Sequence, residues 1–163
     1  PPRAPGVDGP TLLVCGSAAA WAGGRRRECA EAGLPVFTLE APAGPDAVAD
    51  ALSRSGSAVL AVGSPPRTPG VGPRELLSRL TDLAAEVLSR TAAGRVLAEG
   101  GATGAALARR MGWERFAVTA AVGAGLAGLR PLGTESPVLF VKPGSYAWPQ
   151  GWLPTAPQAS AAR

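Results

Sequence analysis

Short apolar runs that stop at glycine or proline alternate with helix-forming stretches along most of this chain. The runs lie at residues 11–15, 35–39, 58–62, 95–98, 116–119 and 137–141. Runs of this length are typical of buried strands, and strands separated by helices pair in parallel because each connection must cross over the sheet. The alternation therefore predicts an α/β fold: a single open, mainly parallel sheet with crossover helices on its faces.

The stretches between the runs predict helices. The strongest is expected at 73–91, where Pro73 suits the first turn and apolar side chains recur every three or four residues. Shorter helices are expected at about 17–32, 45–55 and 105–111. One further segment predicts a flexible loop, because its three glycines follow neither helical nor strand spacing: Gly123, Gly125 and Gly128.

Composition limits the chain to one domain. With 163 residues, of which 46% are hydrophobic, it can bury one good core but not two. Residues 1–10 are rich in proline and predict a linker or tail, the folded domain is expected over 11–153, and 154–163 predict a flexible C-terminal tail. Trp148 and Trp152 are expected to hold the terminal segment on the core.

Two residue types that carry much of enzyme chemistry are scarce. The sequence has no histidine and only two cysteines, which excludes Ser-His-Asp triads, Cys-His pairs and most metal sites. Cys15 ends an apolar run and Cys29 lies in a helical pattern. Both are therefore expected to be unpaired core residues of a protein in a reducing compartment.

Charge and hydropathy argue against two classes of partner. The net charge is +4, but Arg25–Arg26–Arg27 is the only basic cluster and no aromatic residues alternate with it. Nucleic-acid binding is therefore not expected. No run reaches the roughly 18 apolar residues of a membrane span, and the N-terminus does not resemble a signal peptide. We expect a cytoplasmic protein without membrane contact.

Three loops at the ends of predicted strands combine glycine with hydroxyl or lysine side chains. They are Gly16–Ser17, residues 99–104 and residues 142–145. The carboxyl ends of parallel strands share one edge of a sheet, and ligands bind at that edge. We therefore expect the three loops to lie together.

The segment Gly100–Gly104 has the properties of an anion cradle. Its glycines let backbone N–H groups approach a phosphate, Thr103 can donate a hydroxyl hydrogen bond, and the next helix points its positive end toward the loop. A tight strand-to-helix turn that needs positive φ angles explains the same glycines without any ligand. The spacing fits neither a Walker loop nor a Rossmann fingerprint.

Two charged residues adjoin these glycines. Lys142 is the only lysine of the chain, and at a strand end it can place its ammonium against a phosphate or simply face solvent. Glu99 is the one carboxylate beside the glycine loop, where it can help to hold Mg²⁺ or pair with an arginine. We favour the arginine pair for Glu99 and leave both roles open for Lys142.

The order of these segments resembles that of a known family. The C-terminal, nucleotide-binding domain of the four-carbon acid sugar kinases begins with a strand ending in Gly-Ser and a helix with paired arginines. It continues with a Gly-Gly-Asp/Glu-Thr-Ser loop before a helix and ends with a Lys-Ser-Gly-Asn-Phe-Gly loop. The matching stretches here are LLVCGSAAAW at 12–21, LAEGGATGAALARRMGW at 97–113 and LFVKPGSYAWP at 139–149.

This resemblance implies ATP-dependent phosphorylation of sugar acids such as threonate or erythronate. It implies that ATP, accompanied by Mg²⁺, contacts six residues: Ser17, Gly100, Gly101, Thr103, Lys142 and Gly144. In the family the sugar lies in a separate N-terminal domain, so a sugar-binding kinase domain is expected upstream or on another chain. The isolated chain is expected to be catalytically inactive.

Departures from the family pattern leave other functions open. Ala102 stands where the family has an acidic residue, Gly104 where it has serine, and Pro143 removes an N–H that a phosphate could use. A second hypothesis is therefore a degenerate, non-catalytic α/β module that serves as a protein-interaction or regulatory domain. A Rossmann module for NAD or flavin fits less well, because no acidic residue follows the glycines at the distance that holds a ribose.

Overall fold

Seven strands form one sheet, in the order β2-β3-β1-β4-β7-β6-β5, within the part of the chain that the structure describes. The computed structural model describes residues 9–41, 43–64, 70–123, 126–135, 137–144 and 146–154, without the side chains of 120–123. The strands are β1 (Thr11–Cys15), β2 (Val36–Thr38), β3 (Ser57–Ala61), β4 (Arg95–Glu99), β5 (Phe116–Gly123), β6 (Leu126–Pro131) and β7 (Val138–Lys142).

Five neighbouring strands of this sheet are parallel. The parallel part runs from β2 through β3, β1 and β4 to β7, and β6 and β5 add an antiparallel edge. The predicted fold, an open and mainly parallel sheet with helices on its faces, is confirmed. After β1 the chain builds β2 and β3 on one side and β4 and β7 on the other, so the winding reverses between β1 and β4. Open α/β sheets bind ligands at such a reversal.

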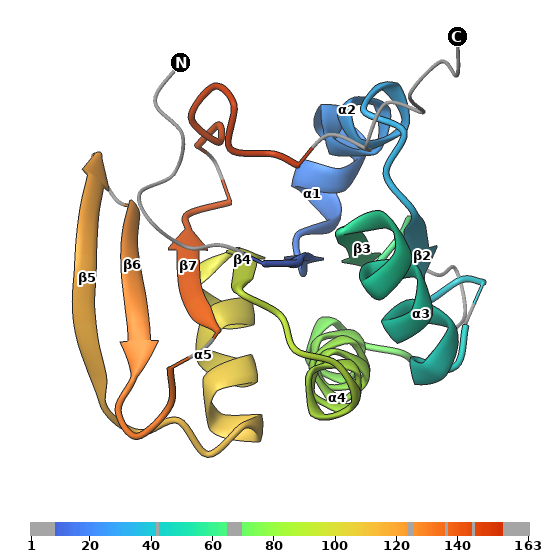
Figure 1. The fold of residues 1–163 in the computed structure, drawn as a ribbon. Coiled ribbons are helices and arrows are strands. Elements are labelled where there is room, and N and C mark those ends of the chain that lie inside the picture. The colour runs from blue at the N-terminus through green and yellow to red at the C-terminus, as the bar shows by residue number, and fades with distance from the viewer. Residues whose placement is uncertain are drawn as a thin grey trace, which may run out of the picture.

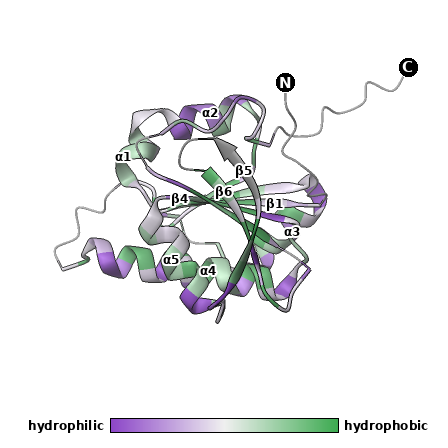
Figure 2. Cartoon of the chain, turned by 90° about the vertical axis from the view of Figure 1, so that its left-hand side faces the viewer, coloured by the Kyte–Doolittle hydropathy of each residue, from purple (hydrophilic) through white to green (hydrophobic). Residues whose placement is uncertain are grey.

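Helices cover both faces of the sheet (Figure 1). One face carries α3 (Pro45–Ser55), α4 (Pro73–Arg90) and α5 (Gly101–Arg110). The other carries the short α1 (Ala18–Ala20), the π-helical turn η1 (Trp21–Arg25) and α2 (Arg26–Glu31), together with the C-terminal segment. The central hydrophobic strands therefore lie between two layers, whereas the described side chains of β5, at the edge of the sheet, are largely exposed. The hydrophilic residues lie mainly on the helices (Figure 2).

The C-terminal segment is held by two tryptophans, as the sequence predicted. Trp148 is 7% exposed and Trp152 1% exposed, and both belong to the core on the η1 side of the sheet. The ring of Trp152 meets Phe140 of β7 edge to face, with 5.0 Å between the ring centres. The segment after β7 is therefore part of the folded domain.

The prediction of a flexible loop around 123–128 is wrong. Gly123 ends β5 and Gly128 lies inside β6, while Gly125 falls outside the described residues. A Cβ added at Gly128 would lie 2.8 Å from Cε1 of Phe140, so glycine lets β6 pass close to that ring. The glycine spacing of β6 therefore does not reveal the strand, because Gly128 is explained by the close approach of Phe140 in the neighbouring strand β7.

Two helix predictions need correction at glycines. The helix expected at about 17–32 is interrupted by the turn η1, where Gly24 adopts a φ of 141°. The helix expected at 105–111 begins earlier, at Gly101, so most of the presumed glycine loop forms its first turn. By contrast, α3 and α4 match their predicted ranges within one or two residues, and Gly56 ends α3 with a φ of 69°.

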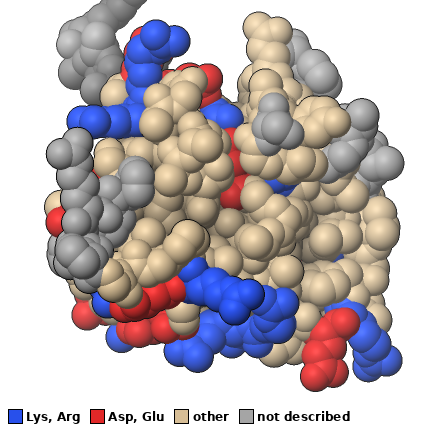
Figure 3. Space-filling model, turned by 180° about the vertical axis from the view of Figure 1, so that it is seen from behind, with Lys and Arg blue, Asp and Glu red and all other residues tan. Residues whose placement is uncertain are grey.

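Several other sequence expectations concern the surface and the termini. Cys15 and Cys29 are free and buried, as predicted. No helix among the described residues is both long and apolar enough to cross a bilayer. Arginines are interspersed with acidic residues along the lower part of the face in Figure 3, where α4 and α5 lie. The predicted linker at 1–10 and tail at 154–163 fall almost entirely outside the described residues.

The first turn of α5 offers a matched test of its packing. A Cβ at Gly104 would lie 2.6 Å from Cγ2 of Val141 in β7, whereas one at Gly101 would have no atom within 4 Å. We expect Gly104→Ala to lower the free energy of unfolding by about 1–3 kcal/mol through overpacking. Gly101→Ala should leave it unchanged or raise it by up to about 1 kcal/mol, because alanine favours helix. Urea unfolding of both variants would measure this, and equal effects would contradict the packing argument.

Candidate functional site

Three parallel strands end side by side at the expected edge. In the register of the sheet, Cys15 of β1 is the neighbour of Glu99 in β4, and Glu99 is the neighbour of Lys142 in β7. The loops that follow these three residues therefore share one edge, next to the reversal of winding. A Cβ added at Gly144 would lie 3.5 Å from Oγ of Ser17, which brings the first and third loops into contact distance.

The buried carboxylate of Glu99 is the centre of this edge. Its side chain is fully buried. Arg25 of η1 donates to both oxygens, from Nε to Oε2 at 3.0 Å and from Nη2 to Oε1 at 3.0 Å. Lys142 forms an ion pair with Oε1 at 2.8 Å. The pairing of Glu99 with an arginine, favoured from the sequence, is confirmed, and the lysine is a second partner.

Hydrogen bonds decide the charge state of this cluster. Burial by itself would raise the pKa of Glu99, but the hydrogen bonds from Arg25 and Lys142 outweigh burial and lower it. The Glu99 carboxylate likewise outweighs burial at Arg25 and raises the pKa of that guanidinium. Glu99 and Arg25 are therefore both ionised at neutral pH, and the carboxylate is shared between two cations.

The ammonium of Lys142 is saturated by protein groups. Besides Glu99, it donates to the carbonyl oxygen of Pro143 at 2.9 Å and to that of Tyr146. It also lies 5.6 Å from the ring centre of Trp148. An ammonium has three protons, and the residue is only 1% exposed. In this conformation Lys142 therefore holds the loop after β7 and has no N–H left for a phosphate.

The hydroxyl of Thr103 is also engaged within the protein. It donates to the carbonyl oxygen of Glu99 at 3.1 Å, and the side chain is 2% exposed. A Cβ at Gly16 would lie 2.0 Å from Oγ1 of Thr103. Glycine is thus required at position 16, because Thr103 packs directly against the loop after β1.

The start of α5, rather than these side chains, is the exposed part of the edge. Gly100 adopts a φ of 107° and donates its N–H to the carbonyl oxygen of Lys142 at 2.8 Å. Gly101 and Ala102, the first two residues of α5, are exposed. The N-cap residue Gly100 makes no side-chain hydrogen bond to the first turn of the helix. The first N–H groups of a helix lack intrahelical partners and carry its positive end.

Ser17 and Gly144 complete the edge. Oγ of Ser17 accepts a hydrogen bond from the N–H of Ala20 at 3.1 Å and so caps α1, and among the described residues its own proton has no acceptor. Both Ser17 and Gly144 are half-buried. Ser145, which belongs to the predicted lysine loop, lies outside the described residues.

The two cysteines near this site are not nucleophiles at neutral pH. Burial, followed by the charge of Glu99, raises the pKa of Cys15 to about 12. Burial also raises the pKa of Cys29 to about 11. Both side chains therefore remain thiols, and they act as small core residues.

Arg25 is the functional residue that sequence reasoning missed. A run of three arginines suggests a solvated helix face, but Arg25 is 7% exposed. The available signal was spacing: Trp21, Arg25 and Cys29 recur every four residues, and all three are buried. An arginine on the apolar stripe of a helix needs a buried acid, and Glu99 supplies it.

Removing the carboxylate tests whether the cluster holds the edge together. We expect Glu99→Gln to lower the free energy of unfolding by about 3–5 kcal/mol, because it leaves the buried Lys142 without a counter-charge and Arg25 with only the half-exposed Glu28. Glu28→Gln is the matched control: Glu28 also pairs with Arg25, but its side chain is 48% exposed. The control should cost less than about 1 kcal/mol in the same urea unfolding experiment. Equal losses would contradict a central role for Glu99.

The lowered pKa of Glu99 also predicts how stability depends on pH. The folded state holds the pKa of Glu99 below its ordinary value of 4.5. Its stabilising contribution is therefore complete above that value and is lost as the pH falls through the folded pKa. Urea midpoints measured from about pH 6 to about pH 3 should fall less steeply in Glu99→Gln than in the unaltered chain. Parallel curves would show that other carboxylates cause the acid loss.

Comparisons with known proteins bear on the fold. Neither a protein-family model nor a curated protein sequence matches the chain. Among solved structures, the chain is similar to a DUF1537 protein (a domain of unknown function) from Bordetella bronchiseptica. That protein was crystallised with bound citrate as a domain-swapped dimer in two crystal forms, with TM-scores of 0.68 and 0.66 at 21% and 19% identity. A DUF1537 protein from Haemophilus influenzae gives 0.68 at 16% identity.

These similarities extend over most of this chain but less than half of each neighbour. They cover 85–86% of this chain and 37–38% of the neighbouring chains. At these identities the likeness establishes a shared fold.

Proposed function

We propose that this chain is the nucleotide-binding domain of a kinase for four-carbon sugar acids of the threonate and erythronate type. The observation that carries the proposal is the exposed, uncapped start of α5 at the reversal of winding, between the loops after β1 and β7. A glycine-led helix N-terminus at this place is a ready anion site, and ATP is the anion that the family resemblance implies.

In this proposal the six residues divide into two groups. The backbone N–H groups at Gly101, the Ser17 hydroxyl and the backbone at Gly144 contact the phosphates. Gly100, Thr103 and Lys142 shape the edge through their internal hydrogen bonds. Lys142 reaches a phosphate only if it leaves Glu99 and the two carbonyl groups.

Mg²⁺ would enter with the nucleotide. Among the described residues, no group of three or more acidic, histidine or cysteine side chains is placed to hold a metal. Glu99 is already shared between Arg25 and Lys142. Mg²⁺ commonly keeps several waters and binds through substrate phosphates, which demands little of the protein. Phosphoryl transfer itself depends mainly on positioning and on stabilising charge.

The sugar acid needs groups that this edge does not supply. The chain spans 37–38% of the length of its structural neighbours. We propose that a second domain, on the same or another chain, brings the sugar acid and the groups that activate its hydroxyl. The present domain alone would then bind nucleotide without turning over substrate.

A non-catalytic module is the second candidate, and one observation favours it. Both Lys142 and Thr103, the side chains with the most useful chemistry for a phosphate, are buried and bonded within the protein. Pro143 offers no N–H. An edge that has lost its ligand would keep its fold and could serve as an interface or regulatory domain.

A charge placed at the start of α5 separates these candidates. Gly101 is exposed, and a Cβ placed there has no neighbouring atom within 4 Å outside its own helix turn. Gly101→Asp should therefore fold normally, because an acid favours a helix N-terminus, but it should repel a bound phosphate. We expect calorimetric titration with Mg·ATP to give binding that weakens about tenfold or more in Gly101→Asp. The isosteric Gly101→Asn should weaken it much less.

Two results would count against the nucleotide proposal. Equal affinity of the Asp and Asn variants for Mg·ATP would show that the phosphates do not lie near the start of α5. No detectable heat with any form, in a chain that circular dichroism reports as folded, would favour the non-catalytic module.

A further inference from the structure

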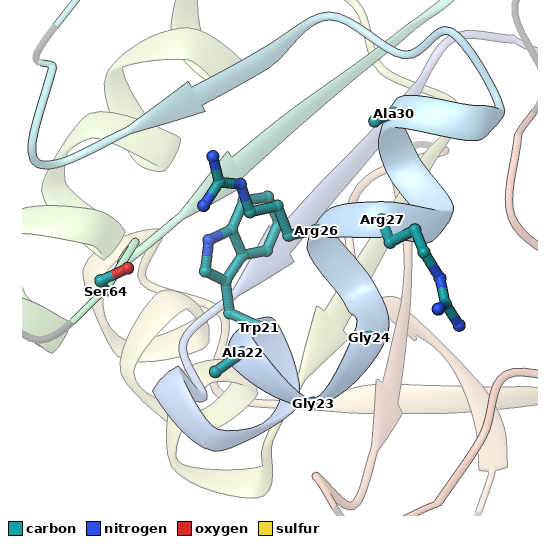
Figure 4. A pocket seen from close by; sticks show the side chains of 8 residues that line it. All are labelled: Trp21, Ala22, Gly23, Gly24, Arg26, Arg27, Ala30 and Ser64. Atoms are coloured by element: carbon teal, nitrogen blue, oxygen red, sulfur yellow. The ribbon is translucent and has the colours of Figure 1, made fainter.

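A hollow lies next to the segment after β1, on the side of β3 and not on the side of β4 and α5. It has a volume of about 540 Å³ and lies between the η1–α2 segment and Ser64, which follows β3 (Figure 4). An adjoining hollow of about 290 Å³ shares Trp21, Arg26 and Ser64 with it and continues toward Glu40. Cavities of this size are typical of small-molecule sites. Because β3 and β4 flank β1 on opposite sides, this hollow and Gly101 are separate features of the edge.

Helical spacing explains why these residues line the hollow. Positions four apart lie on one face of a helix. The inward face is buried and consists of Trp21, Arg25 and Cys29. The positions one residue later turn toward the hollow: Ala22, Arg26 and Ala30. The three consecutive arginines thus separate, and only one is directed into the core.

Arg26 is the available cation of the hollow. It is exposed, and among the described residues it forms no ion pair. In Figure 4 the side chains of Trp21 and Arg26 extend toward Ser64, whereas Arg27 extends away from it. Arg27 also has an acidic partner, Glu31, at 3.7 Å. Glu40 lines the far end of the adjoining hollow and is not paired with Arg26.

The two glycines of η1 keep the wall beside Arg26 open. A Cβ at Gly23 would have no atom within 4 Å, and one at Gly24 would approach only Oε1 of Glu28, at 3.9 Å. Gly24 is held at a φ of 141°, a conformation that only glycine adopts readily. Here the turn removes side chains from the hollow's wall. The polar side chains that remain in its lining include Arg26, Arg27 and Ser64, and of the two arginines only Arg26 extends toward Ser64.

We propose that this hollow binds a small organic anion, whose carboxylate or phosphate group pairs with Arg26 while its body lies along the wall formed by Ala22, Gly23 and Ala30. A guanidinium recognises either anion through two parallel hydrogen bonds. The proposal is independent of the nucleotide proposal, because it uses neither α5 nor the loop after β7.

Amide chemical shifts can test this site with two defined probes. The ¹⁵N-labelled chain is titrated with citrate, which represents carboxylates, and with glycerol phosphate, which represents phosphate esters. We expect saturable shifts at Gly23, Gly24 and Ser64 for at least one probe, and the probe that binds more tightly identifies the class of anion. Shifts confined to Gly101 and its neighbours, or none up to millimolar concentrations, would overturn the proposal.

Matched variants decide whether Arg26 is responsible. Arg26→Gln should weaken the tighter probe about tenfold or more. Arg54→Gln, on α3, removes the same charge from an arginine that is 74% exposed, and it should leave the affinity unchanged. Gly23→Asp should abolish binding by repulsion, whereas the isosteric Gly23→Asn should retain most of it. Equal effects of Arg26→Gln and Arg54→Gln would show that net charge alone attracts the anion, and this would overturn the proposed site.

Discussion

The contact of Glu99 with Arg25 and Lys142 is the constraint on which the rest of this edge depends. Removing three charged groups from water is costly, and it is tolerated only when nearly every hydrogen bond is made. Meeting that condition fixes four parts of the chain at once: β4, β7, the turn η1 and the loop from Pro143 to Tyr146. The exposed start of α5 at Gly101 and the half-buried Gly144 are positioned by this internal arrangement.

The burial of the polar side chains at this edge limits the ways in which it could bind a ligand. Side-chain chemistry at the edge is directed inward, where Lys142 and Thr103 serve the fold. Binding at the edge would therefore rely on amide groups and the dipole of α5, which recognise anionic shape more than chemical identity. Such a surface suits a nucleotide held for a partner domain, and it equally explains how the fold can persist without a ligand.

The sequence predicts most of the parallel sheet because β1, β3, β4 and β7 are buried almost throughout, and such strands form nearly continuous apolar runs. Prediction from the sequence fails where one residue type occurs for two different structural reasons. Glycine at 128 suggests a loop but is required by the ring of Phe140, and Gly101 suggests a loop but begins a helix. The sequence did not predict that Lys142 and Arg25 are buried, because their burial depends on Glu99, which is distant from Arg25 in the sequence. That the three loops lie at one edge follows from the topology of a parallel sheet alone. That the ammonium of Lys142 donates all its protons to protein groups does not follow from topology.

The turn η1 makes the length of the segment between β1 and β2 unusually sensitive to change. Successive residues of an α-helix are rotated by about 100°, and a π turn accommodates one residue more than an α turn. Deleting Gly23 or Gly24 would leave Trp21 and Arg25 three positions apart instead of four, which in a regular helix changes the angle between them by about 100°. Either the tryptophan would leave the core or the guanidinium would leave Glu99. Homologous chains should therefore tolerate exchange of residues in this turn more readily than insertion or deletion.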